Sequence, residues 1–329
     1  MMAVLSRDNL VPLLKRLSEK MEVVAPIRVE GTPVFATWKG EPLALEENPL
    51  CSPVEFLLPQ KEVLFSYVQY SGRYTFEAAL WRARLIFGIR PCDLKAISIL
   101  DMLFGAEPHD EAYLARRRST VLVAYNCIRP GVDCSCLQMD AGPGGREGFD
   151  LQLTEIGSGY LAEAGSPAGA KMLEEQAEFF SEAREEHLQE KEKLLKEARE
   201  MLEPREDRSP SAIKNAMEKA DWEALGKRCL ACGSCTLVCP VCHCFNILDQ
   251  GVPDGQRIRC RDCCLLSGFS RMASGANPRA TQGERLKNWY LDKFEYIPAN
   301  TGLWGCVGCG RCSRVCLGEM DRWALEVKR

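Results

Sequence analysis

Two cysteine-rich runs near the C-terminal end of this 329-residue chain carry its most recognisable chemistry. Each run has the spacing C-x2-C-x2-C-x3-C, and Pro240 follows the first of them. In bacterial ferredoxins, three cysteines of such a run bind one [4Fe–4S] cluster and the fourth binds the other. We therefore expect crossed ligation of two clusters. The first set would be Cys229, Cys232, Cys235 and Cys316, and the second set would be Cys306, Cys309, Cys312 and Cys239.

Structural zinc is the alternative for these two runs. Zinc sites usually present cysteines as separated C-x2-C pairs that close a single tetrahedron. Here Gly233 and Gly310 follow the middle cysteines, where a backbone without a side chain can pass close to an inorganic core. The matched four-cysteine runs favour at least two [4Fe–4S] clusters over zinc.

A third group of cysteines is scattered along the N-terminal half of the chain. Apolar runs at 83–89 and 120–125 predict buried strands, and a helix is expected between them over 94–104. Such a βαβ unit has parallel strands, and the loops at their carboxyl ends lie side by side. These loops would bring together Cys92, Cys127, Cys134 and Cys136. We expect a third cluster there; the alternative is buried unligated thiols, which pack as small hydrophobic groups.

The stretch between the two runs, residues 240–305, is an insertion with five more cysteines. A fourth metal site is expected from Cys242, Cys244, Cys264 and Cys260. Cys263, His243 or Asp262 could replace Cys260 as its fourth ligand. The alternative is that these groups tune the first two clusters through hydrogen bonds to sulfur.

Basic and aromatic side chains follow within the same insertion. The basic ones are Arg271, Arg279, Arg285, Lys287 and Lys293. Basic residues interleaved with aromatic ones can bind single-stranded nucleic acid. Charge balance for cysteine-ligated clusters explains them more economically, and the net charge of −4 also argues against a nucleic-acid partner.

The remaining segments predict an α+β protein. We expect a helix over 7–21 capped by Ser6 or Asp8, short strands at 33–38 and 55–58, and a glycine-rich loop at 142–148. This loop precedes an alternating segment that predicts a hairpin rather than a phosphate-binding turn. Charged helices are expected over 168–203 and 210–225.

These segments suggest three regions. Residues 1–165 would form an α/β domain with a cysteine-ligated cluster, and 166–226 a charged helical linker. Residues 227–329 would form a ferredoxin-like domain with two [4Fe–4S] clusters and the insertion. No apolar run approaches the roughly 20 residues that span a bilayer, and no leader is evident, so we expect a cytoplasmic protein.

The chain resembles the family of the anaerobic sulfite reductase A subunit and the sulfhydrogenase beta subunit along most of its length. The resemblance lies in F-L-L-P from Phe56, G-I-R-P-C-D-L-K-A-I from Gly88, L-A-R-R-R from Leu114, N-C…P-G…C-S-C from Asn126, G-F-D-L-Q-L-T-E-I-G-S-G-Y-L from Gly148, C-P-V-C-H-C-F from Cys239, F-S-R-M-A-S-G-A-N-P-R from Phe269 and G-C-V-G-C-G-R-C from Gly305. The chain departs from the family at 261–264, where an aromatic-Asp-Ser-Cys segment is usual, and at Leu317, where proline is expected.

The resemblance implies an iron–sulfur electron-carrier subunit of a multisubunit oxidoreductase. Its implied partners are a flavin- and NAD(P)-binding reductase subunit and a terminal hydrogenase, sulfite reductase or heterodisulfide-reductase-type module. We find no nucleophile–base pair or phosphate loop, so catalysis is expected in other subunits, and whether the chain is itself an enzyme stays open. The alternative is a self-contained redox enzyme whose substrate binds at a cluster with an open coordination position.

Overall fold

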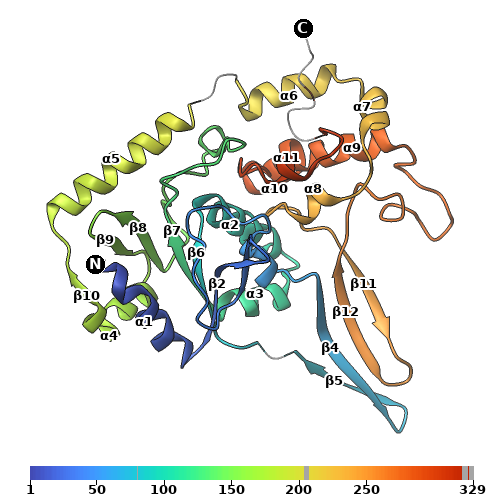
Figure 1. Ribbon diagram of the computed structural model, residues 1–329. Coiled ribbons are helices and arrows are strands. Elements are labelled where there is room, and N and C mark those ends of the chain that lie inside the picture. The colour runs from blue at the N-terminus through green and yellow to red at the C-terminus, as the bar shows by residue number, and fades with distance from the viewer. Residues whose placement is uncertain (80, 204–206, 321–324, 326–329) are drawn as a thin grey trace.

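The computed structural model describes residues 1–79, 81–203, 207–320 and 325, and it combines helices with two β-sheets (Figure 1). The expected α+β class is confirmed. The larger sheet has eight strands in the order β10-β1-β9-β8-β7-β6-β2-β3. Its strands are β1 (Met2–Leu5), β2 (Glu22–Val29), β3 (Thr32–Thr37), β6 (Arg84–Ile89), β7 (Thr120–Tyr125), β8 (Leu151–Ile156), β9 (Gly159–Ala164) and β10 (Phe180–Glu182).

The centre of this sheet is parallel and is covered on both faces. Strands β2, β6, β7 and β8 run parallel, and the outer pairs are antiparallel. Side chains of alternating residues enter different cores: Leu85 and Val123 pack under α1 (Arg7–Ser18), whereas Ile86 and Leu122 pack under α2 (Pro91–Gly105). Burial on both faces explains why β6 and β7 are nearly continuous apolar runs.

The expected βαβ unit is confirmed by the parallel pairing of β6 with β7. The connection contains α2 and α3 (Glu111–Arg118). Helix α2 begins at Pro91, earlier than predicted, because proline fits the first helical position. Cys92 therefore lies in the first turn of a helix and not on a loop, which corrects the sequence prediction.

Three other local predictions are also tested. Helix α1 is capped by Ser6, whose hydroxyl accepts a hydrogen bond from the Asn9 amide at 3.3 Å, and the hairpin β8–β9 follows the glycine-rich loop as expected. The strand expected at 55–58 is wrong, because η1 (Pro53–Phe56) is a 3-10 turn there.

The long helix expected over 168–203 is also wrong. The chain forms α4 (Pro167–Glu175), a 3-10 turn at η3 (Ala177–Phe179), strand β10 and then α5 (Glu185–Met201). The helical pattern is broken because β10 pairs with β1 and forms the edge of the larger sheet, a long-range contact that outweighs local helix propensity. Likewise, α6 (Pro210–Lys219) and α7 (Trp222–Arg228) replace the single helix expected over 210–225.

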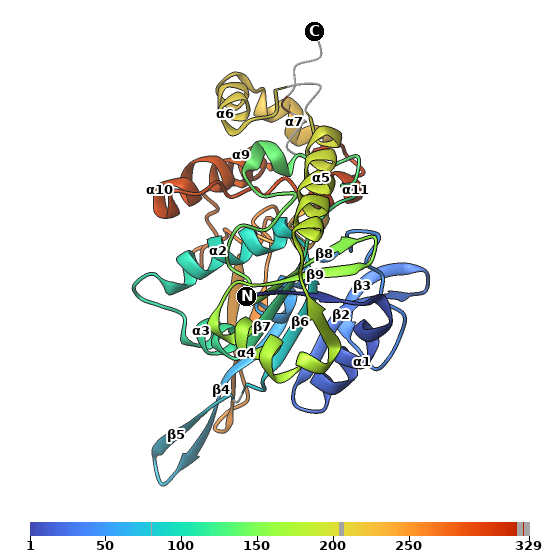
Figure 2. The same ribbon diagram turned by 90° about the vertical axis from the view of Figure 1, so that its left-hand side faces the viewer.

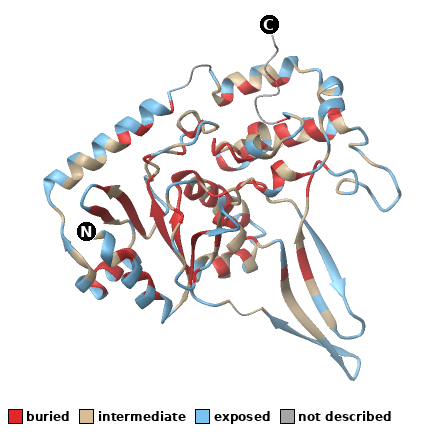
Figure 3. Ribbon diagram, in the orientation of Figure 1, coloured by how far each residue is buried: buried red, intermediate tan, exposed pale blue. Residues whose placement is uncertain are grey.

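A smaller antiparallel sheet joins the N-terminal half to the insertion. Its order is β11-β12-β4-β5, from β4 (Lys61–Tyr70), β5 (Arg73–Ala78), β11 (Phe245–Gln250) and β12 (Gly255–Arg261). Both views show it projecting from the molecule as an arm (Figures 1 and 2). Its outer strands β5 and β11 are exposed along their length (Figure 3).

Short helices surround the two cysteine runs. They are α7, α8 (Ser234–Leu237), α9 (Gln282–Leu291), the π-helical turn η4 (Asp292–Tyr296), α10 (Ile297–Thr301) and α11 (Arg311–Val315). The largest apolar core includes Ile97 of α2 together with Trp289 of α9 and Val307 between cysteines. The two halves of the chain therefore share one core. None of the helices described is long and apolar enough to cross a membrane.

Candidate metal centres

The two cysteine runs adopt matching backbone conformations. In the first run, Ala231 and Gly233 flank Cys232 with φ of 51° and 75°. In the second run, Gly308 and Gly310 have φ of 66° and 73° on either side of the middle cysteine. Each run then enters a short helix, and these helices, α8 and α11, pack together. Left-handed residues next to helical ones turn successive amides inward, an arrangement found at many iron–sulfur sites.

The first set of cysteines surrounds one cavity. The thiols of Cys229, Cys232, Cys235 and Cys316 line it together with the apolar side chains of Leu230, Leu265, Leu286 and Met320. The fourth cysteine comes from the distant second run, as crossed ligation requires. A [4Fe–4S] cluster binds one thiolate at each iron, so its ligands surround a space in this manner.

Two hydrogen bonds to sulfur support this fit. The Gln282 amide donates to Cys229 Sγ at 3.2 Å, and the Met320 backbone amide donates to Cys316 Sγ at 3.0 Å. Hydrogen bonds to ligating sulfur tune iron–sulfur sites. The donor set and the surroundings therefore fit a [4Fe–4S] cluster, while the ligation itself stays a prediction.

The second set also draws on both runs. Burial raises the pKa of Cys309, and the neighbouring charge of Cys239 raises it further. Lys293 donates from Nζ to Cys239 Sγ at 3.3 Å. Burial disfavours the charged form of Lys293, but electrostatic interactions with Cys239, Cys242 and Asp292 outweigh the effect of burial and raise the pKa of Lys293 well above its usual value.

The third set is assembled by the fold from two separate places in the chain, the first turn of α2 and the segment that follows β7. Burial raises the pKa of Cys136, and the thiols of Cys134, Cys127 and Cys309 act on it in the same direction. Burial likewise raises the pKa of Cys92, with smaller effects from Cys309 and Cys136. All four cysteines of this set are therefore neighbours, and they lie beside Cys309 of the second set.

Backbone contacts join the third set to the second run. The Ser135 amide donates to the Gly308 carbonyl at 2.8 Å, and Cys134 Sγ donates to the Cys309 carbonyl at 3.8 Å. A Cβ atom at Gly308 would lie 2.5 Å from the Cys136 nitrogen, so glycine permits this close approach.

A buried ion pair reinforces the same junction. Arg311 of α11 donates to both carboxylate oxygens of Asp93 in α2, at 2.6 and 2.9 Å. Both side chains are fully buried, and the Ser52 hydroxyl also donates to Asp93 at 2.7 Å. Asp93 follows Cys92, and Arg311 lies between two cysteines of the second run, so the pair holds the second and third sets together.

The cysteines of the insertion are grouped differently from the prediction. Cys242 donates a hydrogen bond that lowers the pKa of Cys239, and Cys264 donates one that lowers the pKa of Cys244. Cys264 also lies close enough to Cys242 to raise the pKa of that thiol. Cys239, Cys242, Cys244 and Cys264 are thus neighbours.

The other residues considered for the fourth site have different contacts, and the Asp262 backbone amide donates to the Cys244 carbonyl at 2.9 Å. Cys260 lies in β12, with Asn246 and Lys61 opposite it on the flanking strands. Cys263 lies by the first set, 3.2 Å from a Cβ placed at Gly233. The His243 ring contacts the Val241 carbonyl at 3.0 Å. Across the residues described, no three His, Cys, Asp or Glu side chains are arranged to hold a single metal ion.

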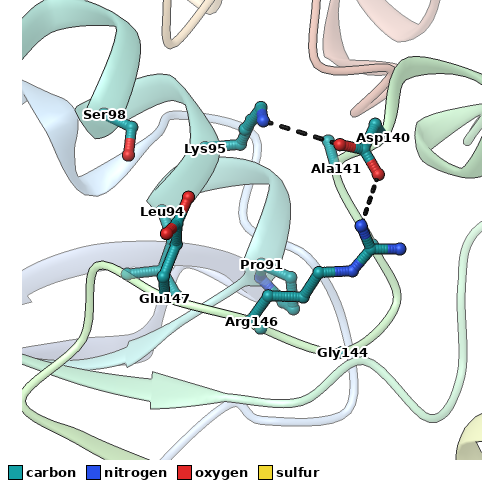
Figure 4. Close-up of a pocket in the computed structure, with 11 residues that line it drawn as sticks. Pro91, Leu94, Lys95, Ser98, Asp140, Ala141, Gly144, Arg146 and Glu147 are labelled. Carbon is teal, nitrogen blue, oxygen red and sulfur yellow. Dashed lines mark hydrogen bonds and ion pairs between the residues drawn. The ribbon is translucent and has the colours of Figure 1, made fainter. Parts of the chain in front are cut away.

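A pocket borders the third set between α2 and the glycine-rich loop (Figure 4). Pro91, Lys95 and Ser98 line it from the helix, and Asp140, Gly142 and Arg146 are among the residues that line it from the loop. The two cations are both paired with Asp140, Lys95 at 3.7 Å and Arg146 at 2.9 Å. A Cβ at Gly142 would lie 3.0 Å from Cys136 Sγ, so the pocket lies directly beside a thiol of the third set.

Several residues of these centres were not singled out from the sequence. Gln282, Asp93 and Arg311 have no motif of their own, although Asp93 and Arg311 each adjoin a cysteine. In the sequence, Lys293 is distinguished only as one member of a basic stretch. Whether a polar or charged side chain is buried beside a cysteine sulfur depends on long-range packing, which the local sequence does not show.

Comparison with known proteins agrees with this geometry. Residues 228–320 match the family model of the 4Fe-4S dicluster domain. The chain is also similar to sulfhydrogenase 2 subunit beta of Pyrococcus furiosus, with 28% identity over 321 residues, covering 93% of this chain and 91% of that protein. The resemblance expected from the sequence motifs is confirmed, and it extends over nearly the whole chain.

Proposed function

We propose that this chain is the iron–sulfur electron-carrier subunit of a multisubunit oxidoreductase. It would relay single electrons between a flavin- and NAD(P)-binding reductase subunit and a terminal module of the hydrogenase, sulfite reductase or heterodisulfide-reductase type. The name of the relative, a beta subunit of a sulfhydrogenase, supports the assignment to a complex. The proposed location is the cytoplasm, with neither direct membrane insertion nor a nucleic-acid partner.

The observation that carries this proposal is the continuity of the cysteine sets. Helices α8 and α11, which contain cysteines of the first and second runs, pack together, and Cys134 Sγ of the third set donates to the carbonyl of Cys309 in the second at 3.8 Å. Cys239 neighbours Cys242 of the insertion. Electron transfer weakens steeply with distance, so a series of adjacent sites is what a relay needs.

The chain's own residues would hold and tune these sites. A bound [4Fe–4S] cluster supplies a centre that accepts and releases one electron at a time. The thiolates would anchor it, the Gln282 and Met320 amides would donate to sulfur, and the apolar lining would exclude water. These are the features by which a protein sets a cluster's potential.

Anaerobic purification with native partners tests the proposal. We expect acid-labile sulfide, at least roughly eight iron atoms per chain, about twelve if the third set also holds a cluster, and co-purification of a flavin-containing subunit. A colourless protein that contains zinc and lacks acid-labile sulfide would exclude the electron-carrier function.

A self-contained redox enzyme is the second candidate, and the pocket beside Cys136 is the observation that favours it. Such an enzyme needs a substrate pocket next to a redox centre. Turnover of sulfite, polysulfide or a disulfide by the isolated chain, lost on Lys95→Met, would support this candidate. An isolated chain with intact clusters and no turnover would favour the carrier subunit.

A further inference from the structure

Lys293 is a buried ammonium group whose hydrogen-bond partners include two cysteine sulfurs. Its Nζ donates to Cys239 Sγ at 3.3 Å, to Cys242 Sγ at 3.5 Å and to the Gly305 carbonyl at 3.3 Å. The residue is only 3% exposed. Lysine is almost never so deeply buried without a paired negative charge.

The sulfurs are the closest source of that negative charge. The Gly305 carbonyl is neutral, and the Trp289 ring, 5.3 Å from Nζ, offers only the weak attraction of an aromatic face. Asp292, the adjacent residue, adds a negative charge nearby. A buried ammonium is tolerated when its partners are thiolates, which is the state of cysteines that ligate a cluster.

The fold fixes Lys293 in this position by a reciprocal contact. The Gly305 amide donates to the Lys293 carbonyl at 2.8 Å, while Lys293 Nζ donates to the Gly305 carbonyl. A Cβ at Gly305 would lie 2.7 Å from the Lys293 Cα, so only glycine allows this approach just before Cys306. Lys293 also lies in the π-helical turn η4, a local widening often found at functional positions.

We propose that Lys293 is a positioning residue whose fixed positive charge raises the reduction potential of the site containing Cys239. This inference rests on the proposed function and on Cys239 being a ligand. Adding one electron makes the site more negative by one charge, and a cation held at its sulfur stabilises the reduced state more than the oxidised one. Because the ammonium also contacts Cys242, the same charge would act on the neighbouring set in the insertion.

The test is a potentiometric titration of the anaerobically purified full chain, followed by electron paramagnetic resonance. Lys293→Met should lower the midpoint potential of one cluster. We expect the equilibrium constant for its reduction to fall by on the order of tenfold, which corresponds to about 59 mV for a one-electron step. Lys293→Gln, which keeps a donor without the charge, should lower it as well, and Lys293→Arg should keep it near the wild-type value. Lys287→Met, at an exposed position of α9, is the matched control and should leave every potential unchanged.

The outcomes separate this inference from the proposed function. Unchanged potentials in Lys293→Met with full iron content would overturn the inference and leave the carrier function standing. If the Met and Gln variants lose iron and the Arg variant retains it, the positive charge is needed and the inference holds; iron loss in all three would overturn a charge-specific role. A wild-type chain without reducible clusters would instead overturn the proposed function.

Discussion

Cys239 and Cys316 each end one cysteine run and lie beside the cysteines of the other. Cys316 lines the cavity of the first run, and the charge of Cys239 acts on Cys309 of the second. Each of these thiols therefore has a neighbour in the opposite run, which supports the crossed ligation that we propose. Crossed ligation would make the two runs interdependent.

Replacing these two cysteines tests the crossed arrangement. Cys316→Ser should impair the cluster of the first run, and Cys239→Ser that of the second, because each loses one of four thiolates. Iron content and electron paramagnetic resonance signals measure the loss, with Cys51→Ser, a half-buried cysteine outside all four sets, as the control. If each variant impaired only the cluster of its own run, crossed ligation would be wrong.

Gly308 carries a second prediction about single residues. Alanine there must adopt a left-handed conformation, at a cost of about 1–2 kcal/mol, and its Cβ would also meet the Cys136 nitrogen at 2.5 Å. Gly275→Ala is the matched control, because φ is also positive there, at +87°, but no atom lies within 4 Å. Denaturant unfolding should show a larger loss of stability for Gly308→Ala, and equal losses would contradict the proposed contact.

Helices α2 and α11 are the elements that hold the second and third cysteine sets against each other. The buried Arg311–Asp93 ion pair joins these two helices. Burying two charges is costly, so the pair contributes mainly to specificity: each charge is tolerated only while the other is present. The position of Cys92, one residue before Asp93, depends on this pair.

Removing one member of the pair should therefore be strongly destabilising. Arg311→Met is expected to lower the free energy of unfolding by about 3–5 kcal/mol, because it leaves Asp93 as an unpaired buried charge. Adding Asp93→Asn should recover part of that loss. Arg314→Met, at an exposed arginine of the same helix, should change stability by less than about 0.5 kcal/mol. Additive losses in the double variant, measured by denaturant unfolding, would argue against the pair.

Across the whole molecule, the N-terminal and C-terminal halves are interlocked. Strand β12 of the insertion pairs with β4, and α10 packs against α2. Buried Arg259 of β12 and Arg116 of α3 share the carboxylate of Glu62. The three-region division predicted from the sequence stays a prediction, but its first and third regions share one apolar core.

This shared core predicts cooperative unfolding. Tryptophan fluorescence and the visible absorbance of the clusters should change at the same denaturant concentration, because α9 and the cysteine runs belong to the core that contains α2. Arg259→Met, which leaves Glu62 with one arginine, should move both transitions together. Loss of cluster absorbance well before the fluorescence transition would show that the C-terminal region unfolds independently.

The sequence by itself indicated [4Fe–4S] clusters, because four-cysteine spacing is a local property that directly reflects cluster geometry, and the match of residues 228–320 to the 4Fe-4S dicluster domain agrees. The crossed pairing of the two runs stays a prediction. The sequence also determined the βαβ unit that contains β6 and β7. Two apolar runs with a helix between them predict parallel strands, and the right-handed rule for such connections leaves few possible topologies. The third set followed from that topology, although the start of α2 at Pro91 placed Cys92 in a helix.

Only the tertiary structure decided which charges meet the sulfurs and which strands join the two halves. Nothing in the local pattern distinguishes buried Lys293 from exposed Lys287, or shows that β10 interrupts a helical stretch. Likewise, the grouping of Cys239 with Cys242, Cys244 and Cys264 in place of Cys260 depends on the β12–β4 pairing. These features arise from contacts between residues far apart in the chain. The energies of such contacts exceed the local helix and strand propensities that can be read from a sequence.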